Sequence, residues 1–153
     1  MQQGAISIPG KRYRLWRIWD EKRPLLLFIL LNPSLGNATD NDPTIRRLIY
    51  FSRTFGYGGV YVGNLYSCIS PNPNDLKATD KMAEQENINH IKGMMHLCQD
   101  VVYAWGNQGD YPKWLNALED RPLCFGFTKK GNPKHPLYLP NSSSLINFRP
   151  KKG

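Results

Sequence analysis

Cysteine is scarce in this chain: Cys68, Cys98 and Cys124 are its three cysteines, and they lie far apart. An odd number of widely spaced cysteines argues against a disulfide framework, and none has a partner at metal-ligand spacing. We therefore expect reduced thiols in the core, no metal site and no cofactor.

Long apolar runs are also missing. No run approaches the roughly 20 residues that a membrane-spanning helix needs, and the first residues, MQQGAISIPG, lack the hydrophobic core of a signal peptide. The 153 residues suffice for one ordinary hydrophobic core. We expect a monomeric cytoplasmic protein, a single α/β domain over residues 1–153 with a basic tail at 149–153.

Acidic residues are few, with 12 Asp and Glu against 20 Lys and Arg, and the formal net charge is +8. Such an excess favours a polyanionic partner, because contacts with phosphates release counterions. We expect nucleic acid, most of all DNA, or a nucleotide; the alternative is a basic surface that only keeps the protein soluble. The residues expected to contact phosphates are Arg46, Arg47, Lys129, Lys130 and Lys134.

Apolar segments of strand length alternate with helical patterns along the chain. Residues 11–18 alternate charged and apolar side chains, which predicts a half-exposed edge strand paired in a hairpin with the buried run 25–31. Further strands are expected at 59–65, 101–105 and 122–127, and helices at 42–55, 82–98 and 111–119. This alternation predicts three layers, with a central, mostly parallel sheet flanked by helices.

Asparagines follow two of the buried strands. Asn32 ends the run LLLFILLN and Asn64 ends GVYVGN, and the carboxyl ends of parallel strands are where open α/β sheets bind ligands. An amide can orient a water or hydrogen-bond a nucleobase edge; alternatively, each asparagine only caps a turn. Pro33 and Ser34 continue the first loop, Trp105 and Asn107 follow the third strand, and these four residues are also expected to contact the substrate.

The loop after Asn32 contains two aspartates. Asp42 precedes a proline and a helical pattern and is expected to cap that helix, which leaves Asp40 as a candidate general base. His135 lies in the turn KHPLYLP, where the following proline restricts the backbone, so its imidazole could face a developing negative charge. Trp105 could instead belong to the core.

Four ordered motifs resemble one protein family. They are LLNPSLGNATDNDPTIRRL, FGYGGVYVGNLYS, AWGNQG and GFTKKGNPKHPLYLP. Their series is similar to that of the domain-of-unknown-function 1643 (DUF1643) family over about residues 11–148. The family name implies no activity.

More distantly, the order of motifs resembles the uracil-DNA glycosylase superfamily, with an Asn-Pro motif, a second strand-end asparagine and a late His-Pro motif. The resemblance implies that Asn32 positions a water, Asn64 reads the base and His135 stabilises the departing base. Pro136 and Leu137 would lie in a loop that inserts into the duplex.

Two positions depart from that superfamily. Ser34 replaces a glycine of the first motif, and Leu137 replaces the serine that usually follows His-Pro. These changes argue against uracil itself and leave a bulkier or modified base, a free nucleoside or no catalysis as the alternatives. We expect an N-glycosidic hydrolase that acts on an uncommon or modified base in DNA. The alternative is a non-catalytic nucleic-acid or nucleotide-binding module on the same fold, and a protein-interaction domain comes third.

Overall fold

The computed structural model describes residues 1–33, 36–69, 81–119 and 121–149, with only the backbone for 81–84. Its strands are β1 (Gln2–Ile8), β2 (Lys11–Ile18), β3 (Leu25–Leu30), β4 (Gly59–Asn64), β5 (Asp100–Tyr103), β6 (Leu123–Cys124) and β7 (Ile146–Asn147). Its helices are α1 (Pro43–Thr54), α3 (Lys81–Leu97), the short 3₁₀ turn η1 (Gly106–Gln108) and α4 (Lys113–Asn116).

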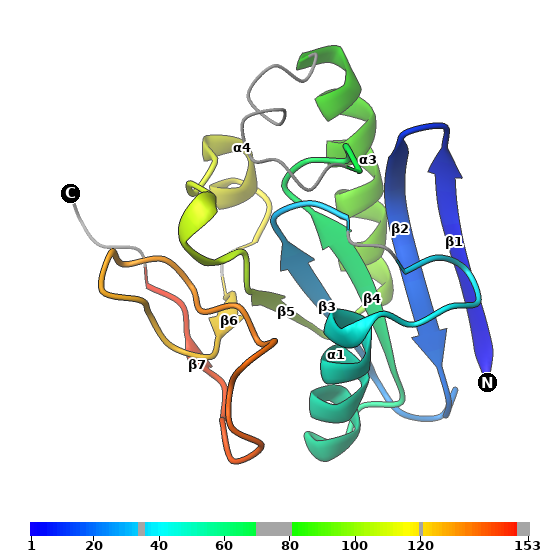
Figure 1. Cartoon of the computed structure of the whole chain (residues 1–153), viewed down its shortest axis with the longest axis vertical. Helices are drawn as coiled ribbons and strands as arrows, with labels where there is room; N and C mark the ends of the chain where they lie inside the picture. The colour runs from blue at the N-terminus through cyan, green and yellow to red at the C-terminus, as the bar shows by residue number, and fades with distance from the viewer. Residues whose placement is uncertain (34–35, 70–80, 120, 150–153) are drawn as a thin grey trace.

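The strands form one mixed sheet in the order β1-β2-β4-β3-β5-β6-β7 (Figure 1). The four strands β4, β3, β5 and β6 are parallel, as the alternation predicted, while β1, β2 and β7 run antiparallel to their neighbours. Among the described residues, no helix combines the length and the apolar character needed to cross a bilayer.

The predicted edge hairpin is wrong in its pairing. Strand β2 does not pair with β3; it lies between β1 and β4, and β1 takes the edge. The edge hairpin is therefore β1-β2. Residues 2–8 read QQGAISI, whose glutamines and glycine weaken the strand signal.

A bulge in β2 changes which way its side chains point. Ile6 pairs with Arg14 and Ser7 with Arg12, so Tyr13 is the extra residue. Beyond the bulge, Leu15 packs in the cluster under α1, whereas Tyr13 stacks on His90 of α3. Because the extra residue reverses the alternation, Arg12 reaches the α1 face and binds the carbonyl of Gly36.

The charged positions of β2 are not all exposed, contrary to the predicted half-exposed strand. Arg12 is 3% exposed and Arg17 is 0% exposed. Both guanidinium groups instead bind the loop before α1. A buried guanidinium needs hydrogen-bond acceptors for its donors, and the loop carbonyls of Gly36, Asn37 and Asp40 supply acceptors here.

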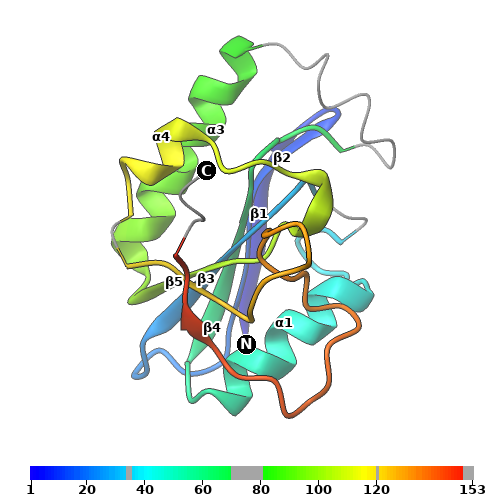
Figure 2. The same ribbon diagram turned by 90° about the vertical axis from the view of Figure 1, so that its left-hand side faces the viewer.

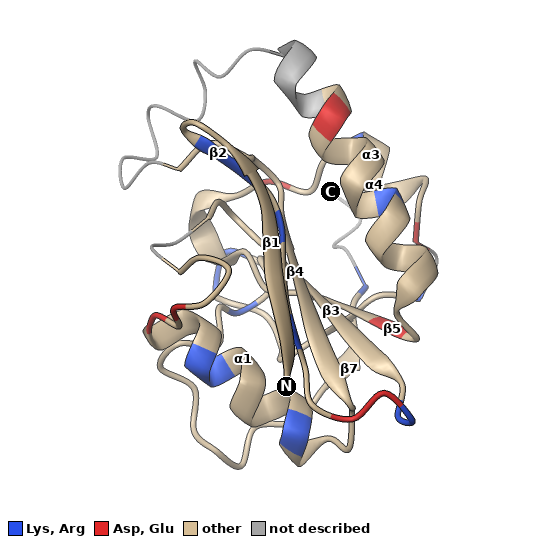
Figure 3. Cartoon of the chain, turned by 90° about the vertical axis from the view of Figure 1, so that its right-hand side faces the viewer, with Lys and Arg blue, Asp and Glu red and all other residues tan. Residues whose placement is uncertain are grey.

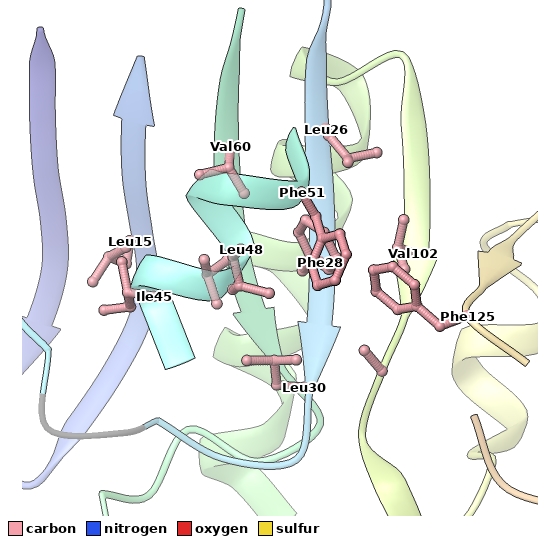
Figure 4. Close-up of a cluster of buried hydrophobic side chains, with 12 residues drawn as sticks. Leu15, Leu26, Phe28, Leu30, Ile45, Leu48, Phe51, Val60, Val102 and Phe125 are labelled. Carbon is pink, nitrogen blue, oxygen red and sulfur yellow. The ribbon is translucent and has the colours of Figure 1, made fainter. Parts of the chain in front are cut away.

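The main core cluster lies between α1 and the sheet (Figure 4). Ile45, Leu48 and Phe51 of α1 pack on apolar side chains of the central strands. A second cluster on the opposite face includes Ile91 and Met94 of α3. Figure 2 shows α1 and α3 on opposite sides of the sheet.

Helix α1 begins and ends as its sequence predicts. The side chain of Asp42 accepts a hydrogen bond from the backbone N–H of Ile45, and Pro43 occupies the first turn. The helix stops before Gly56, whose φ is +87°. Two later elements are shorter than predicted: α4 has 4 residues and β6 has 2, and Gly126 beyond β6 has a φ of +115° that no regular strand adopts.

Candidate functional site

The carboxyl ends of β3, β4 and β5 lie side by side, as the sequence predicted. Leu30 pairs with Asn64, and the backbone N–H of Ala104 donates to Ile29. The three strands end at one edge of the sheet (Figure 1). Asn64 ends β4, and Asn32 and Trp105 follow β3 and β5, so all three residues belong to this edge.

Asn64 is the most unusual side chain at this edge. It is 1% exposed, and in the described part of the chain neither its amide nitrogen nor its carbonyl oxygen has a hydrogen-bond partner. Its alternation with Val60 and Val62 places it toward the α1 face. Its backbone carbonyl accepts a 2.7 Å hydrogen bond from the side chain of Asn87 on α3, so the strand end is held while its amide is left unpaired.

The first loop is held against the start of β2. The amide nitrogen of Asn32 donates to the backbone carbonyl of Cys68 at 3.4 Å, and Pro33 is buried. Cys68 in turn forms an isolated antiparallel β-bridge with Lys11, the first residue of β2. Ser34 lies outside the described residues, so its predicted contact with a ligand stays a prediction.

Two buried arginines of β2 hold the next part of the loop. Arg17 Nε donates to the side chain of Asn41 at 2.9 Å, and its Nη2 reaches the carbonyl of Asp40 at 3.2 Å. Burial lowers the pKa of both guanidinium groups, that of Arg12 to about 10, where Asp42 opposes the shift and the charge of Arg17 adds to it. The sequence showed that these two positions are charged, but it did not show that the loop would bind their guanidinium groups.

The two aspartates of the loop differ in role. Asp42 accepts N–H bonds from Ile45 at 2.8 Å and from Gly36 at 3.2 Å, so it caps α1 and closes the loop. Asp40 is exposed, and its carboxylate accepts a 2.9 Å bond from the side chain of Asn37. Its candidate role as general base stays a prediction.

His135 lies close enough to the start of α1 to interact with Asp42. Its Nδ1 accepts the N–H of Leu137 at 3.2 Å, which leaves the hydrogen of the neutral imidazole on Nε2. Burial lowers the pKa of His135 below its ordinary value of 6.5, and the Asp42 carboxylate only partly opposes this. A neutral His135 is thus an N–H donor near a helix N-terminus.

The hairpin at residues 127–133, which precedes His135, is bound to the segment that follows β5. The N–H of Gly106 donates to the carbonyl of Pro133 at 2.9 Å. The side-chain oxygen of Asn107 accepts bonds from Thr128 at 2.6 Å and from Asn132 at 3.2 Å. Asn107, predicted to contact substrate, therefore braces the hairpin that precedes His135.

Trp105 belongs to the second core cluster. It is 2% exposed and packs against Tyr103, Tyr111 and Phe148. This position agrees with the alternative that the sequence left open, a core tryptophan. It lies with Leu65 and Leu115 on the α3 side, whereas Asn64 alternates toward α1.

The predicted phosphate-binding residues also divide. Arg46, Lys129, Lys130 and Lys134 are exposed, and Figure 3 shows Lys and Arg positions coloured along α1. Arg47 is instead engaged within the molecule, because its guanidinium binds the carbonyl of Leu139 and the side chain of Asn141, each at 2.7 Å. Pro136 is buried and Leu137 is half-buried.

A cavity of about 430 Å³ lies elsewhere, beside β6 and β7. Its lining is formed by Arg121, Pro122, Asn147, Phe148 and Arg149, none of them a predicted site residue. Across the described ranges, the His, Cys, Asp and Glu side chains form no group of three or more that could hold a metal ion.

Comparison with known proteins identifies the family. Residues 12–137 match the family model described as "Protein of unknown function (DUF1643)". Neither the curated proteins nor the solved structures include a match. Because the family model spans most of the chain, from the buried Arg12 through Asn64 to the His135 turn, the protein belongs to the DUF1643 family of proteins of unknown function.

Proposed function

We propose that the carboxyl edge of β3, β4 and β5 binds a nucleobase and that the protein hydrolyses the N-glycosidic bond of an uncommon or modified base in DNA. One observation carries the proposal: the amide of Asn64 is buried, and both of its polar atoms lack partners among the described residues. Leaving buried polar groups unpaired costs about 1–3 kcal/mol each. A base edge with one donor and one acceptor would pair with both.

The position of His135 supports the hydrolytic step. Cleavage leaves an anionic base and a sugar with oxocarbenium character, so a donor near the base lowers the barrier. With Nδ1 accepting the N–H of Leu137, the Nε2–H of neutral His135 is such a donor. Asn32 would orient the attacking water. The packing of α1 and α3 on opposite faces supports a three-layer arrangement like that of uracil-DNA glycosylases.

A binding module without catalysis is the second candidate, and the aspartates favour it. Both oxygens of Asp42 accept backbone N–H bonds, and Asp40 is exposed and bound to Asn37. Both carboxylates are thus engaged in hydrogen bonds within the loop, which argues against either one activating a water as a general base.

The test is incubation with DNA that carries a panel of natural and modified bases, followed by alkaline cleavage and mass spectrometry of released bases. We expect one base to be released. His135→Ala and Asn32→Ala should each lower turnover by about 10²-fold or more, with DNA binding retained. Asn64→Ala should change which base is accepted, because a mismatched base leaves polar atoms unpaired.

The matched control is Asn147→Ala, which removes an exposed asparagine of β7 and should leave turnover unchanged. Base binding that depends on Asn64 without any release would favour the binding module. Free bases that bind equally well to wild type and Asn64→Ala would contradict the nucleobase site itself.

A further inference from the structure

The loop that follows His135 exposes an aromatic side chain. Tyr138 is 93% exposed, more than any other large hydrophobic residue that the structure describes. Aromatic side chains usually pack in protein cores, where each buries about 150–250 Å² of surface. A ring left almost wholly in solvent is therefore a candidate contact for a partner.

The backbone on both sides of Tyr138 is held in place. On one side, Pro136 is buried and the N–H of Leu137 binds Nδ1 of His135. On the other, Arg47 donates to the carbonyl of Leu139. The Arg47 guanidinium itself lies over the ring of Phe51, 4.7 Å from its centroid. The loop thus presents Tyr138 in a defined position, so little conformational entropy would be lost on binding.

The charge around this loop selects one class of partner. Residues 121–149 contain no Asp or Glu, and the exposed Lys129, Lys130 and Lys134 precede the loop. An aromatic ring beside a purely basic segment is the combination with which proteins bind single-stranded nucleic acid, because bases stack on the ring and cations contact phosphates.

We propose that Tyr138 stacks on an unpaired base of a DNA strand, and that Lys129, Lys130 and Lys134 contact the phosphates of that strand. Arg47 is a positioning residue, which holds the loop and does not itself contact phosphate. The inference rests on the proposed function, since His135, three positions before Tyr138, belongs to the proposed base site.

The experiment titrates the full chain into a fluorescein-labelled single-stranded DNA oligonucleotide and follows fluorescence anisotropy at several salt concentrations. Tyr138→Ala should weaken binding about 10-fold, a typical loss for one stacked base, and Tyr138→Phe should retain the affinity. The salt slope should be unchanged in Tyr138→Ala and smaller in the triple Lys129→Glu, Lys130→Glu, Lys134→Glu variant. Leu97→Ala removes another exposed apolar side chain, from α3, and should change nothing.

A second oligonucleotide carries 2-aminopurine, whose fluorescence is quenched by stacking. Wild type and Tyr138→Phe should quench it at saturation, and Tyr138→Ala should not. Full affinity and full quenching in Tyr138→Ala would overturn the inference. It would also be overturned if Tyr138→Ala lowered the salt slope together with the affinity, because Tyr138 would then act only by positioning the lysines. The base-release assay on Asn64→Ala is separate, so its failure with Tyr138-dependent stacking intact would overturn only the proposed base site. A wild-type chain that binds no oligonucleotide at low salt would overturn the stacking inference, while free-base binding through Asn64 would still stand.

Discussion

At the scale of single residues, substitution of two buried asparagines near one strand end should change the free energy of unfolding in opposite directions. Asn64 has no side-chain partner in the described structure, whereas Asn87 donates to the carbonyls of Asn64 and Leu65. Replacing Asn64 with Leu removes only unpaired polar atoms, so we expect the free energy of unfolding to stay the same or rise by about 1–2 kcal/mol. Base binding should be lost.

The matched variant is Asn87→Leu, which deprives two backbone carbonyls of their donor and should lower the free energy of unfolding by about 1–3 kcal/mol. Urea unfolding measures both variants. If Asn64→Leu proved as destabilising as Asn87→Leu, Asn64 would have a structural role, and the argument for a ligand at its amide would fail.

The sequence could place Asn32 and Asn64 because each ends an apolar run, and neighbouring parallel strands bring such ends together. It could not show that Asn64 lacks a partner among the described residues, since hydrogen bonding depends on side chains distant in sequence. For the same reason, Arg12 and Arg17 were predicted to be exposed. Alternation shows which side chains share a face of the strand, but it does not show that the loop before α1 covers that face and binds both guanidinium groups.

At the scale of elements, the loop before α1 depends on Arg17. Its guanidinium binds the side chain of Asn41 and the carbonyl of Asp40, and also the carbonyl of Asn37. Arg17→Met keeps the bulk and removes the donors, so we expect the free energy of unfolding to fall by about 3 kcal/mol. Hydrogen exchange should show the amides of residues 36–41 losing protection first.

The control for Arg17 is Arg46→Met on the exposed side of α1, whose effect should stay within about 0.5 kcal/mol. An Arg17→Met protein as stable as wild type, with unchanged exchange in the loop, would show that the loop holds itself.

Helix α1 was predictable to within one residue at each end because its signals are local: a capping aspartate, a proline in the first turn and a glycine beyond the end. The pairing of β2 was not, because it depends on whether β1 forms, and β1 has few apolar residues. Pairing between strands distant in sequence is decided by what else competes for the same edge.

At the scale of the whole molecule, two histidines link stability to pH. Burial lowers the pKa of His135 and of His90 below 6.5, and the charge of Arg14 adds to the shift of His90. Below pH 6.5 the unfolded chain therefore binds more protons than the folded one, so the contribution is complete above this pH and is lost as pH falls toward the folded pKa values. We expect a smaller free energy of unfolding at about pH 5.5 than at about pH 7.5.

Urea unfolding at the two pH values checks this. His135→Gln should reduce the difference between them, whereas His96→Gln, at an exposed position of α3, should not. A His135→Gln protein that kept the full wild-type difference would contradict the assignment.

The bulge at Tyr13 decides which face of β2 carries Arg12. Arg12 and Arg17 are an odd number of positions apart, so on a plain strand they would point to opposite faces. The extra residue of the bulge puts both arginine side chains on one face of the strand, so both reach the same loop. If β2 kept its length but lost the bulge, Arg12 would turn toward α3 and leave Gly36 without it, whereas deleting Tyr13 would leave the two arginines four positions apart, again on one face. The chain should therefore keep both arginines on the loop when Tyr13 is deleted, at the expense of the ring that stacks on His90, and should lose Arg12 from the loop when the bulge is flattened at constant length.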